Sequence, residues 1–277
     1  MTGMPVTFAM NRTCAPQLSL QSFVGLVKAA GIAAVEIRND IPAREFMDGT
    51  APEDLFATLQ DADLRVASVN ALQRFNDWSG ERESEARSLM AYAARLEAPG
   101  VVLCPVHDPD HGWSEAQSER NLRDGLRKLR PILMDFGLKG YVEPLGMPGS
   151  TLKLQRKAVE AVTDIDGWDT YQLCFDTFQF FRCGDERLFP ERIGLAHMSG
   201  ITRNDLAPEC LTEPDRGLVG DGDRVRNVAQ LKALVDAGYT GFVSMEPFNP
   251  AVQQSPDLAE GLKASFAHVG DGLRAGR

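Results

Sequence analysis

The sequence predicts an α/β fold, a (β/α)8 TIM barrel, forming a single domain over residues 1–277. The length of 277 residues is typical of one closed α/β barrel rather than of two small domains. Short apolar or β-branched segments alternate with longer amphipathic segments along nearly the whole chain, as in a parallel sheet with crossover helices. Eight strand segments favour a closed barrel, and the first is not followed by the GxGxxG motif of an open, doubly wound sheet.

The expected strands are short runs rich in Val, Ile, Phe, Leu and Ala, several of them ending on a charged residue. They cover residues 7–10, 34–37, 65–70, 101–105, 140–143, 172–176, 194–197 and 242–246.

The expected helices lie between these strands. In the first, Phe23, Leu26 and Val27 recur at helical spacing, and Gly31 and Gly238 have the positions of glycines that end helices. Residues 180–190, after the sixth strand, are too short and mixed in composition to predict a clear helix. The predicted helices cover residues 20–30, 52–61, 84–96, 114–136, 151–163 and 227–237.

The composition excludes some classes of partner. A net charge of -10 repels phosphate backbones and anionic lipids, so nucleic acid and membrane surfaces are poor partners and a small neutral or cationic molecule fits better. Five cysteines without a CxxC pair are typical of reduced, cytosolic thiols. With no secretory pattern at the N-terminus and no run of membrane-spanning length, we expect a cytoplasmic protein. Whether it is a monomer or a homo-oligomer stays open.

Polar residues that end apolar strands are the candidates for a functional site, because barrel active sites lie at the carboxyl ends of the strands. Any one of them could equally be a residue that caps a helix, or a polar residue whose hydrogen bonds are made by neighbouring groups. Together they are costly to bury around one cavity unless a cation lies among them. The set on strands five to eight contains three carboxylates and one imidazole, which suits Mn²⁺, Zn²⁺, Co²⁺ or Mg²⁺. These residues are Glu143, Asp176, His197 and Glu246, and Glu36 ends the second strand in the same way.

The remaining histidines give weaker signals. His107 and His111 lie in the segment His-Asp-Pro-Asp-His-Gly after the fourth strand, where a solvated turn is favoured over extra metal ligands or a lid. His268, in the polar last helix, is expected to face solvent.

The chain resembles the xylose isomerase-like barrel superfamily of sugar isomerases, epimerases and endonuclease IV-type enzymes. More narrowly, it is similar to the 2-keto-myo-inositol (inosose) isomerases, which implies a role in inositol catabolism and carbohydrate metabolism. The resemblance implies one divalent metal ion on the four residues chosen above, and Glu143 and Glu246 as the proton-transfer pair. It is carried by residues 35–40, 69–76, 176–178, 215–216, 220–222 and 243–246, together with His197.

The same resemblance suggests substrate contacts. Glu36, Arg38 and Asn70 are candidate hydroxyl binders, although Arg38 could instead pair with a neighbouring carboxylate. Arg203 and Arg216, in the loop after the seventh strand, either reach the site or lie on the surface. Gln179 stands where the superfamily commonly has a substrate-binding histidine; it can exchange hydrogen bonds with a hydroxyl but cannot carry charge.

These residues predict an isomerase that moves the carbonyl of a small polyhydroxy ketone by proton transfer through an enediolate, with a metal as Lewis acid. Hydroxypyruvate isomerase, ketose 3-epimerase and inosose dehydratase would use related chemistry and stay open. An endonuclease IV-like nuclease is disfavoured by only four histidines and the acidic charge, and a non-catalytic sugar-binding barrel by the intact ligand set.

Overall fold

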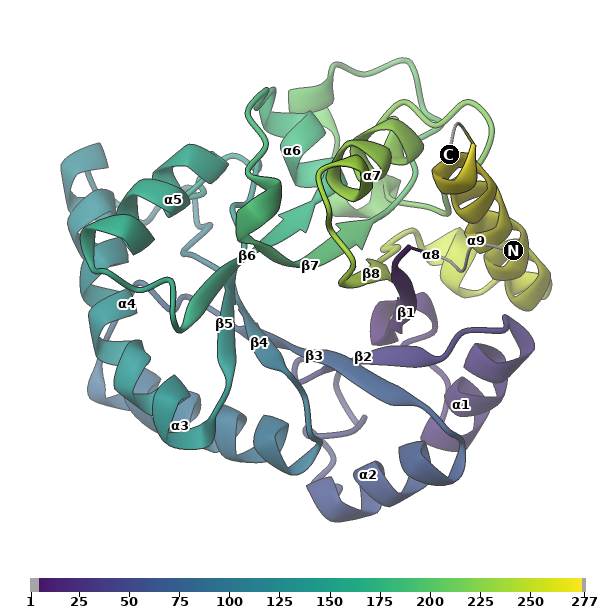
Figure 1. Cartoon of the computed structure of the whole chain (residues 1–277), viewed down its shortest axis with the longest axis horizontal. Coiled ribbons are helices and arrows are strands. Elements are labelled where there is room, and N and C mark those ends of the chain that lie inside the picture. Colours follow the sequence, from purple (N-terminus) through teal and green to yellow (C-terminus); the bar gives the residue numbers. More distant parts are fainter. Residues whose placement is uncertain (1–4, 276–277) are drawn as a thin grey trace.

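The computed structural model describes residues 5–275, in which eight parallel strands close into a barrel with the helices outside it (Figure 1). Each strand pairs with its neighbours in sequence, and β8 closes the ring by pairing with β1. The predicted fold class is therefore confirmed. The strands are β1 (Thr7–Asn11), β2 (Ala34–Arg38), β3 (Arg65–Leu72), β4 (Gly100–Leu103), β5 (Lys139–Val142), β6 (Tyr171–Asp176), β7 (Ile193–Met198) and β8 (Phe242–Met245).

All eight expected strands are present, and their bounds agree closely with the prediction. The agreement follows from the length and composition of the apolar runs, since strands such as β2 and β4 are buried on both faces. Both predicted helix-ending glycines, Gly31 and Gly238, adopt positive φ angles of 74° and 99°, which glycine reaches without steric cost.

The helix prediction was less accurate at the amino-terminal ends. The third helix begins earlier than expected because the Ser79 hydroxyl accepts a hydrogen bond from the Arg82 amide and caps it. The helix expected from residue 151 begins only at Gln155, and a short helix directly follows β6, capped by Asp176. The helices are α1 (Leu20–Ala29), α2 (Pro52–Asp61), α3 (Gly80–Arg95), α4 (Glu115–Phe136), α5 (Gln155–Asp164), α6 (Thr177–Cys183), α7 (Asn227–Asp236), α8 (Pro250–Gln253) and α9 (Leu258–Arg274).

The main core packs the outward faces of the strands against the helices, as where Val35 and Ile37 of β2 join one apolar cluster with Leu55 and Leu59 of α2. A smaller cluster that includes Val102, Tyr141 and Leu195 belongs to strands β4, β5 and β7. Within residues 5–275, no helix combines the length and apolar character needed to cross a membrane.

Candidate active site

The register of the barrel places the predicted strand-end residues at one rim. In the parallel pairing, Asp176 is the partner of His197, and His197 is the partner of Ser244 on β8. Glu143 and Glu246 directly follow β5 and β8. The carboxyl ends of parallel strands meet at the same end of a barrel, so residues far apart in sequence share one site.

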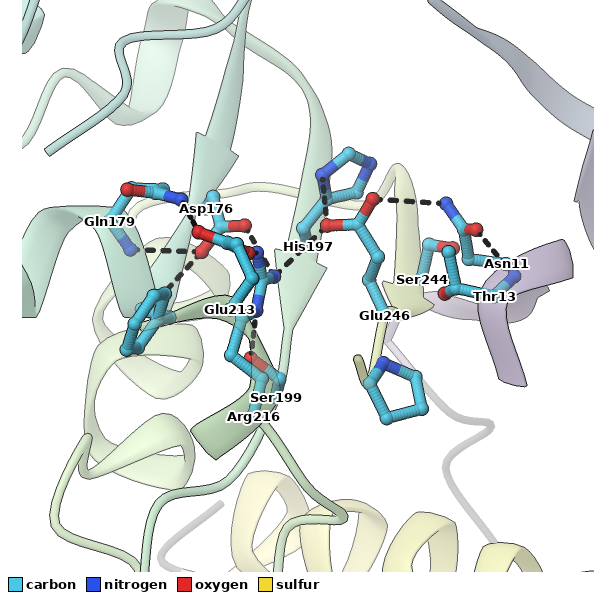
Figure 2. A network of polar contacts seen from close by, with 12 residues as sticks. Asn11, Thr13, Asp176, Gln179, His197, Ser199, Glu213, Arg216, Ser244 and Glu246 are labelled. Atoms are coloured by element: carbon cyan, nitrogen blue, oxygen red, sulfur yellow. Dashed lines mark hydrogen bonds and ion pairs between the residues drawn. The ribbon is translucent and has the colours of Figure 1, made fainter. Parts of the chain in front are cut away.

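Glu143, Asp176, His197 and Glu246 form a buried cluster. Each offers one ligand atom, and these atoms all lie within 4.8 Å of one another. The His197 Nδ1 atom is 3.1 Å from Glu143 Oε1 and 3.4 Å from Glu246 Oε2. Figure 2 shows Asp176, His197 and Glu246 turned toward a common centre.

The cluster fits a divalent ion. Ligand bonds of about 2.0–2.2 Å place neighbouring ligand atoms roughly 3–3.6 Å apart, and the two distances from His197 Nδ1 fall in this range. Three carboxylates with one imidazole form a donor set that Zn²⁺, Mn²⁺, Co²⁺ and Mg²⁺ accept. The four side chains therefore have both the chemistry and the spacing of a metal site.

His197 is oriented by Glu36. The His197 Nε2 atom lies 3.0 Å from Glu36 Oε1, on the ring edge opposite the cluster. Both ring nitrogens face carboxylates, which suits an imidazolium that donates on both edges, or a neutral ring whose Nδ1 lone pair binds a cation. Burial lowers the pKa of His197, but Cys174, Glu36 and Glu246 raise it well above its usual range.

Glu36 has a different place from the one predicted for it. It is fully buried and is not among the residues that line the cavity. Burial raises the pKa of its carboxyl group, but His197 and the hydroxyls of Ser68 and Ser244 lower it to about 2. An ionised Glu36 is thus held where it can orient a metal-binding histidine, an arrangement common around metal sites.

Arg216 reaches the cluster from the loop after β7. Its Nη2 atom donates to Asp176 Oδ2 at 2.6 Å and to Glu246 Oε2 at 2.9 Å. The guanidinium carbon lies over the rings of both Phe178 and Phe248, 5.0 Å and 4.9 Å from their centroids. Burial lowers the pKa of Arg216, yet Asp176, Glu213 and Glu246 raise it well above its usual range, so it stays a fixed cation.

The negative charges of the carboxylates in the cluster repel one another. Burial raises the pKa of Asp176 above its ordinary value; Arg216 lowers it, and the nearby charge of Glu246 raises it again. Burial also raises the pKa of Glu246, against the lowering effects of His197 and Arg216. A divalent cation among these groups would relieve both the desolvation and the mutual repulsion.

The cluster opens onto a cavity of about 480 Å³, a volume in the range of small-molecule sites. Of the predicted substrate contacts, Arg38, Asn70, Gln179 and Arg216 line it. The Arg38 Nη1 atom donates to Glu246 Oε1 at 2.9 Å, and its other nitrogens pair with Asp40 at 2.8 and 2.6 Å. Arg38 therefore forms salt bridges with neighbouring carboxylates and also lines the cavity, although the sequence presented these as alternatives.

Gln179 connects two loops at the cavity wall. Its Oε1 atom accepts a hydrogen bond from the Gly146 amide at 2.9 Å. Its Nε2 atom donates to Glu213 Oε1 at 3.0 Å, and Figure 2 labels these two residues. The loop after β5 and the loop after β7 are thereby linked. Glu213 lines the cavity and also accepts from Arg216 Nη1 at 2.7 Å.

The structure does not bring Arg203 to the cavity. Its side chain is 48% exposed and pairs with Asp205 and Asp215 at the surface, so the prediction that it contacts substrate is not supported. Among the remaining histidines, His107 lines the cavity, against the expectation of a merely solvated turn. His111 packs edge-on against Trp113 away from it.

Some residues at the site were not selected from the sequence. Asn11 ends β1, where its Nδ2 atom donates to Glu36 Oε2 at 2.7 Å and to Glu246 Oε1 at 3.3 Å. The strand-end rule could have found Asn11, because it follows the first apolar run. Ser68 and Glu213 carry no comparable signal, since one lies inside a strand and the other in a long loop.

Comparison with known proteins identifies one matching family and several similar structures. The family described as "Xylose isomerase-like TIM barrel" matches residues 24–268. A xylose isomerase domain containing protein from Salmonella typhimurium LT2 is 24% identical, with a TM-score of 0.86 over 99% of each chain. The IolI protein, solved with a bound zinc atom, is 22% identical, with a TM-score of 0.85 over 97% of this chain and 98% of that one.

An L-ribulose 3-epimerase is also similar in structure, at 16% identity and a TM-score of 0.74 over 97% of this chain and 94% of that one. A search of curated proteins finds no match. At these identities, the solved structures show a common fold.

Proposed function

Because this chain belongs to the xylose isomerase-like TIM barrel family, we propose that it is a divalent-metal-dependent isomerase of a small, neutral polyhydroxy ketone. The best-supported substrate is 2-keto-myo-inositol (inosose), since the site segments resemble those of inosose isomerases. The observation that carries the proposal is the buried cluster of Glu143, Asp176, His197 and Glu246 at the mouth of the barrel.

These four side chains would hold the metal, with Glu36 orienting His197 from behind. When bound, a divalent ion supplies Lewis acidity that stabilises negative charge developing on a ketone oxygen. Zinc is supported by the zinc atom in the similar IolI structure, and the mixed oxygen and nitrogen donors also suit Mn²⁺, Co²⁺ and Mg²⁺.

Glu143 and Glu246 are the proposed proton-transfer pair, and their surroundings differ. Glu246 accepts hydrogen bonds from the guanidinium groups of both Arg38 and Arg216. Glu143 instead has two thiols beside it: Cys104 Sγ is 3.4 Å from Oε2, and Cys174 Sγ is 3.9 Å from Oε1. Two carboxylates in unlike environments can divide the removal and the return of a proton between them.

The cavity favours a neutral substrate. A site that recognises a phosphate or carboxylate usually offers it a cation that is not already neutralised. Here, every arginine on the described cavity wall has a carboxylate partner. Arg38 pairs with Asp40 and Glu246, Arg74 with Asp77, and Arg216 with Asp176, Glu213 and Glu246. This pairing favours inososes and ketoses over the anion hydroxypyruvate.

A ketose 3-epimerase is the second candidate, because it would begin with the same proton abstraction beside a carbonyl. The structural likeness to an L-ribulose 3-epimerase is compatible with it. Epimerisation returns the proton to the same carbon, whereas isomerisation returns it to the neighbouring carbon, so the two products differ in carbonyl position. Inosose dehydratase would instead lose water.

The experiment is a substrate screen with zinc- or manganese-loaded protein. Inososes, ketohexoses and hydroxypyruvate are each incubated in D₂O and followed by NMR. Movement of the inosose carbonyl supports the proposal, inversion at one carbon supports the epimerase, and formation of an unsaturated product supports the dehydratase. Turnover of hydroxypyruvate alone would contradict the argument for a neutral substrate.

A further inference from the structure

We propose that Gln73 and His107 form a subsite that binds the hydroxyl groups of the substrate away from its reacting carbons. This inference rests on the proposed function for the class of substrate, a neutral polyol. Both residues line the cavity, and both carry a hydrogen-bond acceptor that no described residue satisfies.

Gln73 follows β3 directly. Its Oε1 atom is buried and has no hydrogen-bond partner within the described part of the chain. A buried amide oxygen without a donor is unfavourable and uncommon in native proteins, and it calls for a ligand. Because the Gln73 side chain lines a cavity of about 480 Å³, a turn of its amide toward the cavity would bring this oxygen to a substrate hydroxyl.

His107 carries the second acceptor. Its Nδ1 atom lies 3.1 Å from the carbonyl oxygen of Pro105, which can only accept, so Nδ1 bears the hydrogen. A neutral imidazole protonated on Nδ1 leaves Nε2 as an acceptor, and no hydrogen bond from residues 5–275 reaches Nε2.

The backbone beside His107 is held firmly. His107 forms an isolated antiparallel bridge with Ser150, and the Val106 amide donates to Asn76 Oδ1 at 2.8 Å. The Thr151 amide also donates to the Val106 carbonyl at 2.8 Å. A side chain on such a support can orient a ligand without first becoming ordered.

The two acceptors lie on a different part of the rim from the metal cluster. Gln73 and His107 follow β3 and β4, whereas the cluster comes from β5 to β8. In the closed strand order, β3 and β4 are across the barrel from β7 and β8. A ketone whose carbonyl end faces the cluster would therefore direct its distal hydroxyls to Gln73 and His107.

The test measures binding of myo-inositol, which has the ring hydroxyls but no ketone, to the zinc-loaded protein by calorimetry. Gln73→Met keeps the length of the side chain and removes the acceptor. His107→Asn keeps a donor near Pro105 and removes the Nε2 acceptor, while His107→Gln restores a distal amide oxygen. We expect the first two variants to weaken binding roughly tenfold each, and His107→Gln to recover part of that loss.

Two controls make the test specific. Gln60→Met and His268→Asn change the same residue types outside the cavity, at an exposed and a half-buried position, and should bind myo-inositol like the wild type. Cyclohexanediol, which lacks the distal hydroxyls, should bind equally to every variant. The inference is overturned if the wild type does not bind myo-inositol, if Gln73→Met and His107→Asn bind it normally, or if both ligands lose affinity equally.

The measurement also separates this subsite from the proposed function, because it involves no turnover. Binding that depends on Gln73 and His107 in a protein that converts no ketone would support the subsite and contradict the isomerase. Conversion of inosose together with unchanged myo-inositol affinity in the variants would support the isomerase and contradict the subsite.

Discussion

Glu36 Oε1 lies 3.0 Å from His197 Nε2, on the edge of the imidazole ring that faces away from the cluster. This contact fixes the direction of the other ring nitrogen, Nδ1, which is 3.1 Å from Glu143. A histidine held in this way has one nitrogen committed to a carboxylate and the other available to a metal ion. Glu36 is thus a positioning residue for the proposed metal centre.

Removing the charge of Glu36 should weaken metal binding. We expect Glu36→Gln to lower zinc affinity by about 10- to 100-fold, the usual effect of losing a group that orients a metal-binding histidine. Competition with a chromophoric chelator measures the affinity. Glu186→Gln, at an exposed position shortly after α6, is the matched control. Equal zinc affinity for Glu36→Gln and the wild type would show that Glu36 does not position His197 for metal binding.

Metal binding should stabilise the fold, because the ion binds the native cluster and has no comparable site in the unfolded chain. An ion at a hundred times its Kd adds about 2.7 kcal/mol to the free energy of unfolding. For a chain of this size, we expect a rise in Tm of several degrees in differential scanning calorimetry. Asp176→Asn should show a smaller rise, and an identical rise would place the ion elsewhere.

The acid–base pair gives a kinetic prediction. Glu143→Gln and Glu246→Gln keep the side-chain shape but remove the base, so each should lower kcat by roughly a hundredfold to ten-thousandfold. Circular dichroism should show both variants folded. Solvent exchange then separates their roles: without the residue that removes the first proton no deuterium enters the substrate, whereas loss of its partner permits exchange without isomerisation. Near wild-type turnover in both metal-loaded variants would refute the pair.

Gln179 should be important for stability as well as for the shape of the cavity. Gln179→Leu would leave the buried Gly146 amide without an acceptor and Glu213 without one donor, at an expected cost of about 1–3 kcal/mol in the free energy of unfolding. Urea denaturation measures this cost, and Gln60→Leu at an exposed position is the control. A loss no greater than in the control would mean that Gln179 does not connect the two loops.

The strands and the grouping of the four ligand-type residues could be predicted because they depend on local pattern. Short apolar runs that end in Asp, Glu or His predict both the strands of the barrel and the residues at its rim. The closed strand order then brings Glu143 close to His197. No contact between side chains had to be known in advance.

The long loops could not be predicted in the same way. Arg203 and Arg216 lie in one loop after β7 and were equally plausible. Arg216 turns inward and contacts two aromatic rings, whereas the exposed Arg203 pairs with Asp205 and Asp215. Tertiary contacts decide between them. The contact between Glu36 and His197 could not be predicted for a similar reason, since the ring edge that His197 presents to Glu36 follows from packing inside the barrel.

The most direct test of the central claim is deuterium incorporation into inosose in D₂O, followed by NMR with metal-loaded and fully chelated protein. We expect the loaded enzyme to exchange the proton beside the carbonyl and to move the carbonyl to the neighbouring carbon. Chelated protein should do neither, and adding back zinc or manganese should restore both. Full turnover by protein with negligible metal content, or no exchange by loaded protein with inosose or any ketose, would contradict a metal-dependent ketone isomerase.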